Sequence, residues 1–243
     1  EGGTCYNSQV FVDAEGRLCG VHRKLQPTFA ERMIWGQGDG STLRSFEMDG
    51  RRVGGLICWE HTMNLARQAL VNQGEEIHAA SWPGLSTLRG FEDVFDDQVA
   101  AMCRNHALTA QCFVICAANP VTSEALQLME ELVGPQDWLE VGGGWSAVMD
   151  PMARVIAGPH TGLEERLVVA EVDLAQIVAT KLFVDGAGHY ARREVLELRI
   201  DETPHSGWRR ILAHEGGGPP AKPVAPAGSG GDDPARMEER RGQ

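Results

Sequence analysis

The stretch that decides the fold is residues 52–63, RVGGLICWEHTM. Val53 to Ile57 form an apolar run typical of a buried strand, and this run leads directly into Cys58. Beyond it, the spacing of apolar residues predicts a helix with Thr62 as its N-cap. A thiol at a strand-to-helix junction lies near unpaired helix N–H groups, which favour a thiolate and stabilise an oxyanion. Cys58 is therefore a candidate nucleophile, although a lone cysteine behind an apolar run is more often core packing.

The composition is that of an acidic globular protein. The chain has 243 residues, of which 42% are hydrophobic and 23% charged, enough for one large domain. Its net charge of −12 argues against nucleic acid or a membrane surface as partner, because both attract clustered Lys and Arg. No apolar run approaches the roughly 18 residues of a membrane span. The six cysteines lack zinc-ligand spacing, and without a signal segment they predict reduced thiols in the cytoplasm.

The remaining patterns predict alternating strands and helices. Alternating apolar residues predict two hairpins, 6–12 with 18–22 and 146–149 with 154–157. Further strands are predicted at 43–48, 76–81, 111–119, 167–172 and 195–200, and helices at 96–110, 124–132 and 174–178. This order predicts an α/β sandwich. Because the end of the chain is Gly, Pro, Ala and charge, we predict one domain over 1–213 and a disordered tail over 214–243.

The glycine-rich segment 35–41 and His106 resemble functional elements, but their sequence context favours structural roles. The glycine-rich segment 35–41, WGQGDGS, lacks the Gly-Lys-Ser/Thr of a phosphate cradle, so we predict a tight loop whose glycines allow positive φ. His106 falls on the apolar face of the predicted helix 96–110, which favours a hydrogen-bonded core histidine over a catalytic one. Cys112 and Cys116 share one face of the next strand and are predicted to pack.

Two charged residues upstream of Cys58, Lys24 and Glu31, are candidates to act together with the cysteine. Lys24 follows a predicted strand, and Glu31 lies on a loop fixed by Pro27; alone, each would be a solvated surface charge. Several motifs surround them: HRKLQPT at 22–28, WGQGDGSTL at 35–43, CWEH at 58–61, IHAASWP at 77–83, GGGWS at 142–146 and GHYAR at 188–192. Together these motifs resemble the nitrilase branch of the carbon–nitrogen hydrolase superfamily over most of the chain.

The resemblance implies a four-layer α-β-β-α sandwich and a Glu–Lys–Cys triad. In such a site Cys58 attacks the nitrile carbon and passes through thioimidate and thioester intermediates. Lys24 lowers the pKa of the thiol and stabilises negative charge on the nitrogen, helped by the backbone N–H of Trp59. Glu31 matches the family's second, supporting glutamate, which orients Lys24. Glu60 is expected to be structural.

The resemblance also implies the substrate and the partners. Trp59, Trp82 and His61 are the predicted substrate-binding or pocket-shaping residues. Trp59, Trp82, Leu85 and Leu88 favour an aromatic or arylaliphatic nitrile, hydrolysed to a carboxylic acid and ammonia. No cofactor and no metal are implied, since the sequence has no HExxH motif and no Cys/His cluster. The expected partners are the small-molecule nitrile and further copies of the chain, as a homodimer or a spiral homo-oligomer.

One departure from the family pattern leaves alternatives open. The family's general-base glutamate lies well upstream of the lysine, and the chain begins at Glu1 in a strand pattern. We therefore expect an N-terminally truncated domain that is inactive alone. A nitrile hydratase or an amidase of the same superfamily is the first alternative, and an inactive fragment that serves as an interaction scaffold is the second. Product analysis separates the enzymes, and the upstream sequence tests the scaffold.

Overall fold

The computed structural model describes residues 2–92 and 94–205. These residues form one compact unit. The predicted tail, 214–243, and the last part of the predicted domain, 206–213, lie outside the described residues.

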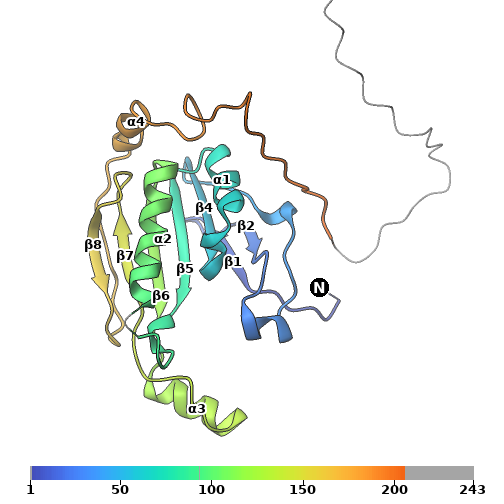
Figure 1. Ribbon diagram of the computed structural model, residues 1–243, viewed down its shortest axis with the longest axis vertical. Coiled ribbons are helices and arrows are strands. Elements are labelled where there is room, and N and C mark those ends of the chain that lie inside the picture. The colour runs from blue at the N-terminus through green and yellow to red at the C-terminus, as the bar shows by residue number, and fades with distance from the viewer. Residues whose placement is uncertain (1, 93, 206–243) are drawn as a thin grey trace, which may run out of the picture. The chain divides into compact units, whose positions relative to one another are not determined.

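A six-stranded mixed sheet forms the centre of this unit (Figure 1). Its strands are arranged in chain order: β3 (Phe46–Met48), β4 (Arg51–Ile57), β5 (Ile77–Pro83), β6 (Phe113–Asn119), β7 (Ser146–Met149) and β8 (Val155–His160). The central strands β4, β5 and β6 are parallel, and the outer pairings are antiparallel. β4 is buried on both faces from Gly54 to Ile57, as expected of a parallel strand inside a sheet, whereas β6 has one more open face, on which Ile115 is 46% exposed.

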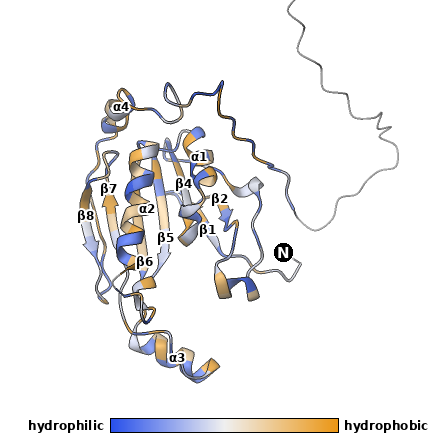
Figure 2. Ribbon diagram, viewed as in Figure 1, coloured by the Kyte–Doolittle hydropathy of each residue, from blue (hydrophilic) through white to orange (hydrophobic). Residues whose placement is uncertain are grey.

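Two helices cover one face of the sheet: α1 (Asn64–Asn72) and α2 (Phe95–Ala110). The hydropathy colouring in Figure 2 shows that α2 carries both hydrophobic and hydrophilic residues. Its hydrophobic stripe, which includes Val99, Cys103 and Ala107, is buried against β6 and its neighbours. Cys112 and Cys116 are also buried in this core, which confirms that they pack.

The opposite face of the sheet receives a hairpin made of β1 (Ser8–Val12) and β2 (Leu18–Arg23). Gln9 on β1 crosses between the layers and donates to Ala79 O at 2.9 Å and Ser81 Oγ at 2.7 Å. Gly55 makes room for it, because a Cβ there would lie 2.5 Å from Gln9 Oε1. Helices, sheet and hairpin form three consecutive layers, α-β-β, of an α-β-β-α sandwich, which agrees with the predicted fold class.

Beyond the central sheet the predictions succeed only in part. The helices α3 (Ser123–Val133) and α4 (Ala175–Lys181) and the hairpin β7–β8 are close to the predicted ranges. The predicted strands at 167–172 and 195–200 are wrong, since both segments are irregular. Leu167 is 89% exposed and Val169 76% exposed. An alternating pattern becomes a strand only where a neighbour takes up its backbone hydrogen bonds, and no described strand pairs with these segments. None of the helices in the described ranges is long and apolar enough to cross a membrane.

Candidate active site

Cys58 lies on a strained turn where β4 ends. A 3-10 helix, η3 (Cys58–Thr62), follows the strand, and α1 begins only at Asn64. The prediction that Thr62 is the helix N-cap is therefore wrong. The Thr62 hydroxyl instead donates to Trp59 O at 2.8 Å. Cys58 itself has φ of 55°, in the left-handed region that is uncommon for residues other than glycine. Strain of this kind concentrates at functional sites, where the surrounding structure holds it in place.

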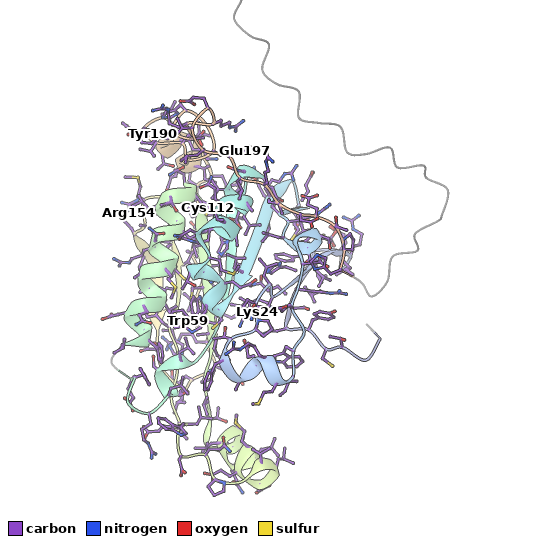
Figure 3. The ribbon with its side chains drawn as sticks, turned by 45° about the vertical axis from the view of Figure 1, so that its right-hand side comes forward. Lys24, Trp59, Cys112, Arg154, Tyr190 and Glu197 are labelled. Carbon is purple, nitrogen blue, oxygen red and sulfur yellow. The ribbon has the colours of Figure 1, made fainter. Side chains whose placement is uncertain are left out.

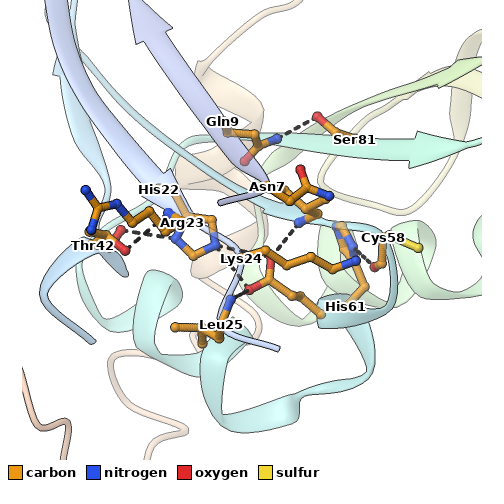
Figure 4. A network of polar contacts seen from close by, with 12 residues as sticks. Asn7, Gln9, His22, Arg23, Lys24, Leu25, Thr42, Cys58, His61 and Ser81 are labelled. Carbon is orange, nitrogen blue, oxygen red and sulfur yellow. Dashed lines mark hydrogen bonds and ion pairs between the residues drawn. The ribbon is translucent and has the colours of Figure 1, made fainter. Parts of the chain in front are cut away.

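Lys24 brings a buried cation to the same part of the fold. Its side chain is fully buried, and Nζ donates to Glu31 Oε2 at 2.5 Å. Figure 3 shows Lys24 and Trp59 at the same level of the fold, and Figure 4 shows the Lys24 side chain extending toward Cys58. The charge of Lys24 acts on the Cys58 thiol. Burying an ammonium group costs several kcal/mol unless a partner compensates, so this placement is typical of a functional site.

Glu31 is held as a carboxylate by three donors. Besides Lys24, the backbone N–H of Thr28 donates at 2.6 Å and Asn7 Nδ2 donates at 3.1 Å. Burial raises the pKa of Glu31, but the hydrogen bonds from Lys24 and Thr28 and the Lys24 charge outweigh it, so the pKa lies below its ordinary value. Such a carboxylate orients a lysine well and is a weak base. Asn7 carries no sequence signal that would have identified it.

The Cys58 thiol is protonated at neutral pH, contrary to the sequence-based expectation. Burial raises the pKa of Cys58 to about 11, although the Lys24 charge and the backbone N–H of Trp59 act to lower it. The thiol is only 4% exposed, so desolvation of the thiolate exceeds the stabilisation by a single ammonium group. Nucleophilic attack by this sulfur therefore requires that its proton be removed.

Glu60 ties the lysine strand to the cysteine strand. Its carboxylate is buried and accepts from the backbone N–H of Leu25 at 2.7 Å and from that of Ile57 at 2.8 Å. These two amides are the immediate neighbours of Lys24 and Cys58 in the sequence. One buried side chain thus fixes both backbones, which agrees with the expectation that Glu60 is structural.

The glycine-rich loop clamps the backbone of Lys24. The N–H of Gly38 donates to Lys24 O at 2.8 Å, and a Cβ at Gly38 would lie 2.2 Å from Arg23 O. The segment forms the predicted tight loop, but its glycines are not needed for positive φ, contrary to the prediction. Gly36, Gly38 and Gly40 do not have positive φ; they permit close approach of another segment instead.

The predicted substrate-binding residues occupy different settings. Trp59 is partly buried, with its ring centroid 6.0 Å from that of Trp82 and 6.0 Å from that of Phe95. Trp82 is only 4% exposed and stacks on the His61 ring at 5.0 Å. His61 is 1% exposed and both ring nitrogens have partners within the protein. Substrate contact by these residues remains a prediction, and the burial of His61 and Trp82 favours a supporting role.

A buried polar cluster lies behind the cysteine turn, and of its members the sequence analysis identified only His106. Glu75 and His78 lie three residues apart around the start of β5, His106 lies on α2, and their ligand-type atoms lie within 4.8 Å of one another. His106 is thus the hydrogen-bonded core histidine that its position on α2 predicts. Although such a set of atoms resembles a metal site, the carboxylate oxygens already accept hydrogen bonds from His78 and His106.

A cavity of about 940 Å³ lies elsewhere, between α1, α2 and the segment after α4. Tyr190 and Glu197 are among its lining residues, and Figure 3 shows both at a distance from Lys24 and Trp59. This cavity is therefore separate from the cysteine site.

A buried cysteine and a buried lysine beside a partly exposed glutamate, in a layered α/β sandwich, are an arrangement that thiol-dependent hydrolases use. The carbon–nitrogen hydrolase family model matches residues 1–182, and the chain belongs to this family. It is 36% identical over 204 residues to an aliphatic nitrilase of Rhodococcus rhodochrous, covering 83% of this chain and 56% of that protein. It is 34% identical to an arylacetone-specific nitrilase of Alcaligenes faecalis, covering 82% of this chain and 56% of that protein. The chain thus spans little more than half the length of these curated relatives.

Solved structures agree on the fold. A carbon–nitrogen hydrolase of Helicobacter pylori matches with a TM-score of 0.66 and 18% identity, covering 80% of this chain and 66% of that one. The NitFhit protein of C. elegans matches with a TM-score of 0.62 and 18% identity, covering 84% of this chain and 47% of that one.

Proposed function

We propose that this chain carries the nucleophile and the supporting lysine of a nitrilase. The observation that carries the proposal is the fully buried Lys24 ammonium, held at 2.5 Å by Glu31 and acting on the Cys58 thiol. The nitrilase names of the relatives support the same chemistry. The overall reaction converts a nitrile and two waters into a carboxylic acid and ammonia.

In the first step the Cys58 thiol gives its proton to a general base other than Glu31 and Glu60, or to hydroxide at raised pH, and its sulfur attacks the nitrile carbon. One carbon–nitrogen π bond breaks, and negative charge develops on the nitrogen. Lys24 Nζ donates a proton to this nitrogen, and the backbone N–H of Trp59 adds a hydrogen-bond donor. The product of this step is a thioimidate on Cys58.

In the second step water adds to the thioimidate carbon and ammonia leaves, which produces a thioester. A second water releases the carboxylic acid and restores the thiol. Each addition of water needs a group that accepts a proton. Glu31 is a weak base because its pKa is lowered, and Glu60 is occupied by two backbone donors. We therefore propose that both the deprotonation of Cys58 and the hydrolysis need a further general base, for which hydroxide substitutes only at raised pH.

The proposed substrate is an aromatic or arylaliphatic nitrile. Trp59, partly buried beside the cysteine and packed on Phe95 and Trp82, supports an apolar acyl site. The relatives include both an aliphatic and an arylacetone-specific enzyme, so a substrate panel decides between the classes.

A cytoplasmic homo-oligomer is part of the same proposal. All six cysteines are free, which supports a reducing compartment. Leu65 on α1 is 70% exposed and Leu108 on α2 is 52% exposed, so the outer surfaces of these helices carry apolar side chains suited to contact with a second copy. Light scattering of the purified protein measures the mass of the assembly.

The function is tested with the full-length protein and phenylacetonitrile, with benzonitrile and an aliphatic nitrile as comparisons. Carboxylic acid and ammonia in equal amounts are expected, and Cys58→Ala should abolish both. Amide as the main product would instead indicate a hydratase. Turnover of the corresponding amides without turnover of any nitrile would indicate an amidase, and no turnover of either by folded protein would favour the scaffold.

A further inference from the structure

A line of buried rings runs from the backbone of Cys58 into the core. His61 Nδ1 lies 2.7 Å from Cys58 O, as Figure 4 shows, and His61 Nε2 lies 3.0 Å from His78 Nε2. His78 Nδ1 lies 2.7 Å from one oxygen of Glu75, and His106 Nε2 lies 2.8 Å from the other. All four side chains are at most 1% exposed.

The positions of the hydrogens follow from the two groups at the ends of this line, the carbonyl of Cys58 and the carboxylate of Glu75. A carbonyl oxygen can only accept, so His61 Nδ1 carries a hydrogen and donates it to Cys58 O. In a neutral His61 the Nε2 atom is then an acceptor, and His78 Nε2 must carry the hydrogen between the two rings. The contact between His78 Nδ1 and Glu75 also needs a hydrogen. Glu75 and His78 therefore share one proton more than a carboxylate and a neutral imidazole possess together.

We propose that Glu75, His78 and His61 are positioning residues that hold Cys58 in its left-handed turn, with His78 as a buried imidazolium paired to the Glu75 carboxylate. These hydrogen bonds all run in one direction: His78 donates to His61, and His61 donates to the backbone carbonyl of Cys58. If His78 lost its extra proton, its remaining hydrogen would go to the Glu75 carboxylate, and the link to His61 would be broken.

Two observations support this placement of the proton. Burial raises the pKa of Glu75, but the charges of His78 and His106 and their hydrogen bonds lower it to about 2, so Glu75 is the ionised member. The sheet also reserves space for the carboxylate, because a Cβ at Gly54 on β4 would lie 2.2 Å from Glu75 Oε1. His106 completes the cluster by donating to the second oxygen.

Charged and titratable groups on neighbouring elements are consistent with this assignment. Arg67 on α1 acts on His61 and His106, and its positive charge disfavours protonation of both rings. Burial lowers the pKa of His61 well below its ordinary value and lowers that of His106 to about 4. Cys112, before β6, faces the Glu75 charge and stays a thiol, because burial and that charge raise its pKa. The hydrogen-bond geometry leaves His78, which contacts Glu75 through Nδ1 and His61 through Nε2, as the ring with a hydrogen on both nitrogens.

The test is the nitrogen spectrum of the histidine rings in protein labelled with ¹⁵N-histidine at neutral pH. Tautomer and charge are read from the ring nitrogen shifts. We expect His61 with a hydrogen on Nδ1 only, His106 with a hydrogen on Nε2 only, and His78 with both nitrogens protonated. A hydrogen on His61 Nε2, or a singly protonated His78, would overturn the proposal. The wild-type spectrum decides this even if every variant fails to fold.

Glu75→Gln is the matched variant, because its amide nitrogen can donate to His78 Nδ1 while its oxygen accepts from His106. We expect His78 to lose one ring N–H in this variant while His61 keeps its hydrogen on Nδ1. A doubly protonated His78 in folded Glu75→Gln would contradict the pairing. One equivalent of bound divalent metal in the purified protein would also contradict it, since a ligated nitrogen carries no hydrogen.

The importance of the Glu75–His78–His61 hydrogen bonds for catalysis rests on the proposed function, whereas the positions of their protons do not. If the rings show the expected pattern and no nitrile or amide is turned over, only the proposed function fails. If turnover is normal and the pattern differs, only the positioning proposal fails.

Discussion

At the scale of single residues, the pair formed by Lys24 and Glu31 makes the sharpest energetic demand. Replacing Glu31 with Gln leaves a buried ammonium with a neutral partner. Because Glu31 is 30% exposed and partly screened, we expect a loss of about 2 kcal/mol in the free energy of unfolding. Addition of a nitrile to Cys58 should also slow by roughly 100-fold, the scale that misplacement of a catalytic group produces.

Urea denaturation and the rate of adduct formation measure the two effects of Glu31→Gln separately. The double variant Lys24→Met/Glu31→Gln is the control. It removes the unpaired charge, so stability should recover while adduct formation stays slow. Unchanged stability and rate in Glu31→Gln would show that the 2.5 Å contact has no function.

Glu60 and Glu75 are both buried carboxylates, so the effects of Glu60→Gln and Glu75→Gln on stability can be compared directly. Glu60 accepts two backbone N–H groups, which cannot become acceptors, so Glu60→Gln must turn its amide toward one of them. An unsatisfied buried donor costs about 1–3 kcal/mol, which we expect as the loss in unfolding free energy. Glu75→Gln should cost less, because a histidine ring can switch from donor to acceptor. Equal losses for the two variants would contradict this account of their hydrogen bonds.

At the scale of elements, the sequence is most informative where a strand carries a continuous apolar run. β4 and β6 were predictable because their apolar runs need no partner to be recognised. The segments 167–172 and 195–200 show the same local pattern but remain irregular, since pairing is a long-range property that alternation does not encode. The η3 turn was missed for a related reason: the Cys58 conformation is held by His61, whose own partners come from β5.

Gly54 on β4 tests how closely the sheet fits the buried cluster. In Gly54→Ala the new Cβ would lie 2.2 Å from Glu75 Oε1, so the carboxylate must shift. We expect a loss of about 1–3 kcal/mol in unfolding free energy, in the range of overpacked cores. In the double variant with Glu75→Ala the space is free, so the two losses should fall short of additivity. Full additivity would show that the alanine disturbs something other than Glu75.

At the scale of the whole molecule, the buried cluster sets the response to acid. The pKa of His106 is about 4 in the folded protein, against about 6.5 for an unperturbed histidine. Between these values the unfolded chain binds a proton that the folded chain does not, so stability falls as pH is lowered from 6.5 to 4. The pKa of Glu75, about 2 when folded and about 4.3 when unperturbed, extends the loss below pH 4 in the same direction.

We therefore expect the free energy of unfolding to drop by about 3 kcal/mol between pH 7 and pH 4 from His106 alone, as an order of magnitude. Urea denaturation at several pH values measures it. His106→Gln should make the curve shallower between pH 6.5 and 4, and the slope that remains is expected from His61, whose pKa burial also lowers. A wild-type curve that is flat across this window would show that His106 titrates normally in the folded protein.

The site as a whole was only partly predictable. Lys24, Glu31 and Cys58 stand in motifs, so sequence alone identified them as candidates. The lowered thiol pKa was not confirmed, because the extent of burial depends on the packing of segments distant in sequence. The contacts of Glu60 and of Glu75 were invisible for the same reason: their partners lie on other elements.

The central claim, that Cys58 is a nucleophile toward a nitrile carbon, is tested most directly by intact mass spectrometry. The folded protein is mixed with phenylacetonitrile at pH 9, where more of the thiol is ionised than at pH 7, and quenched after brief incubation. We expect a mass increase of one nitrile, located on Cys58 by peptide mapping and absent in Cys58→Ala. No adduct on folded wild-type protein, or an adduct on another cysteine, would contradict it.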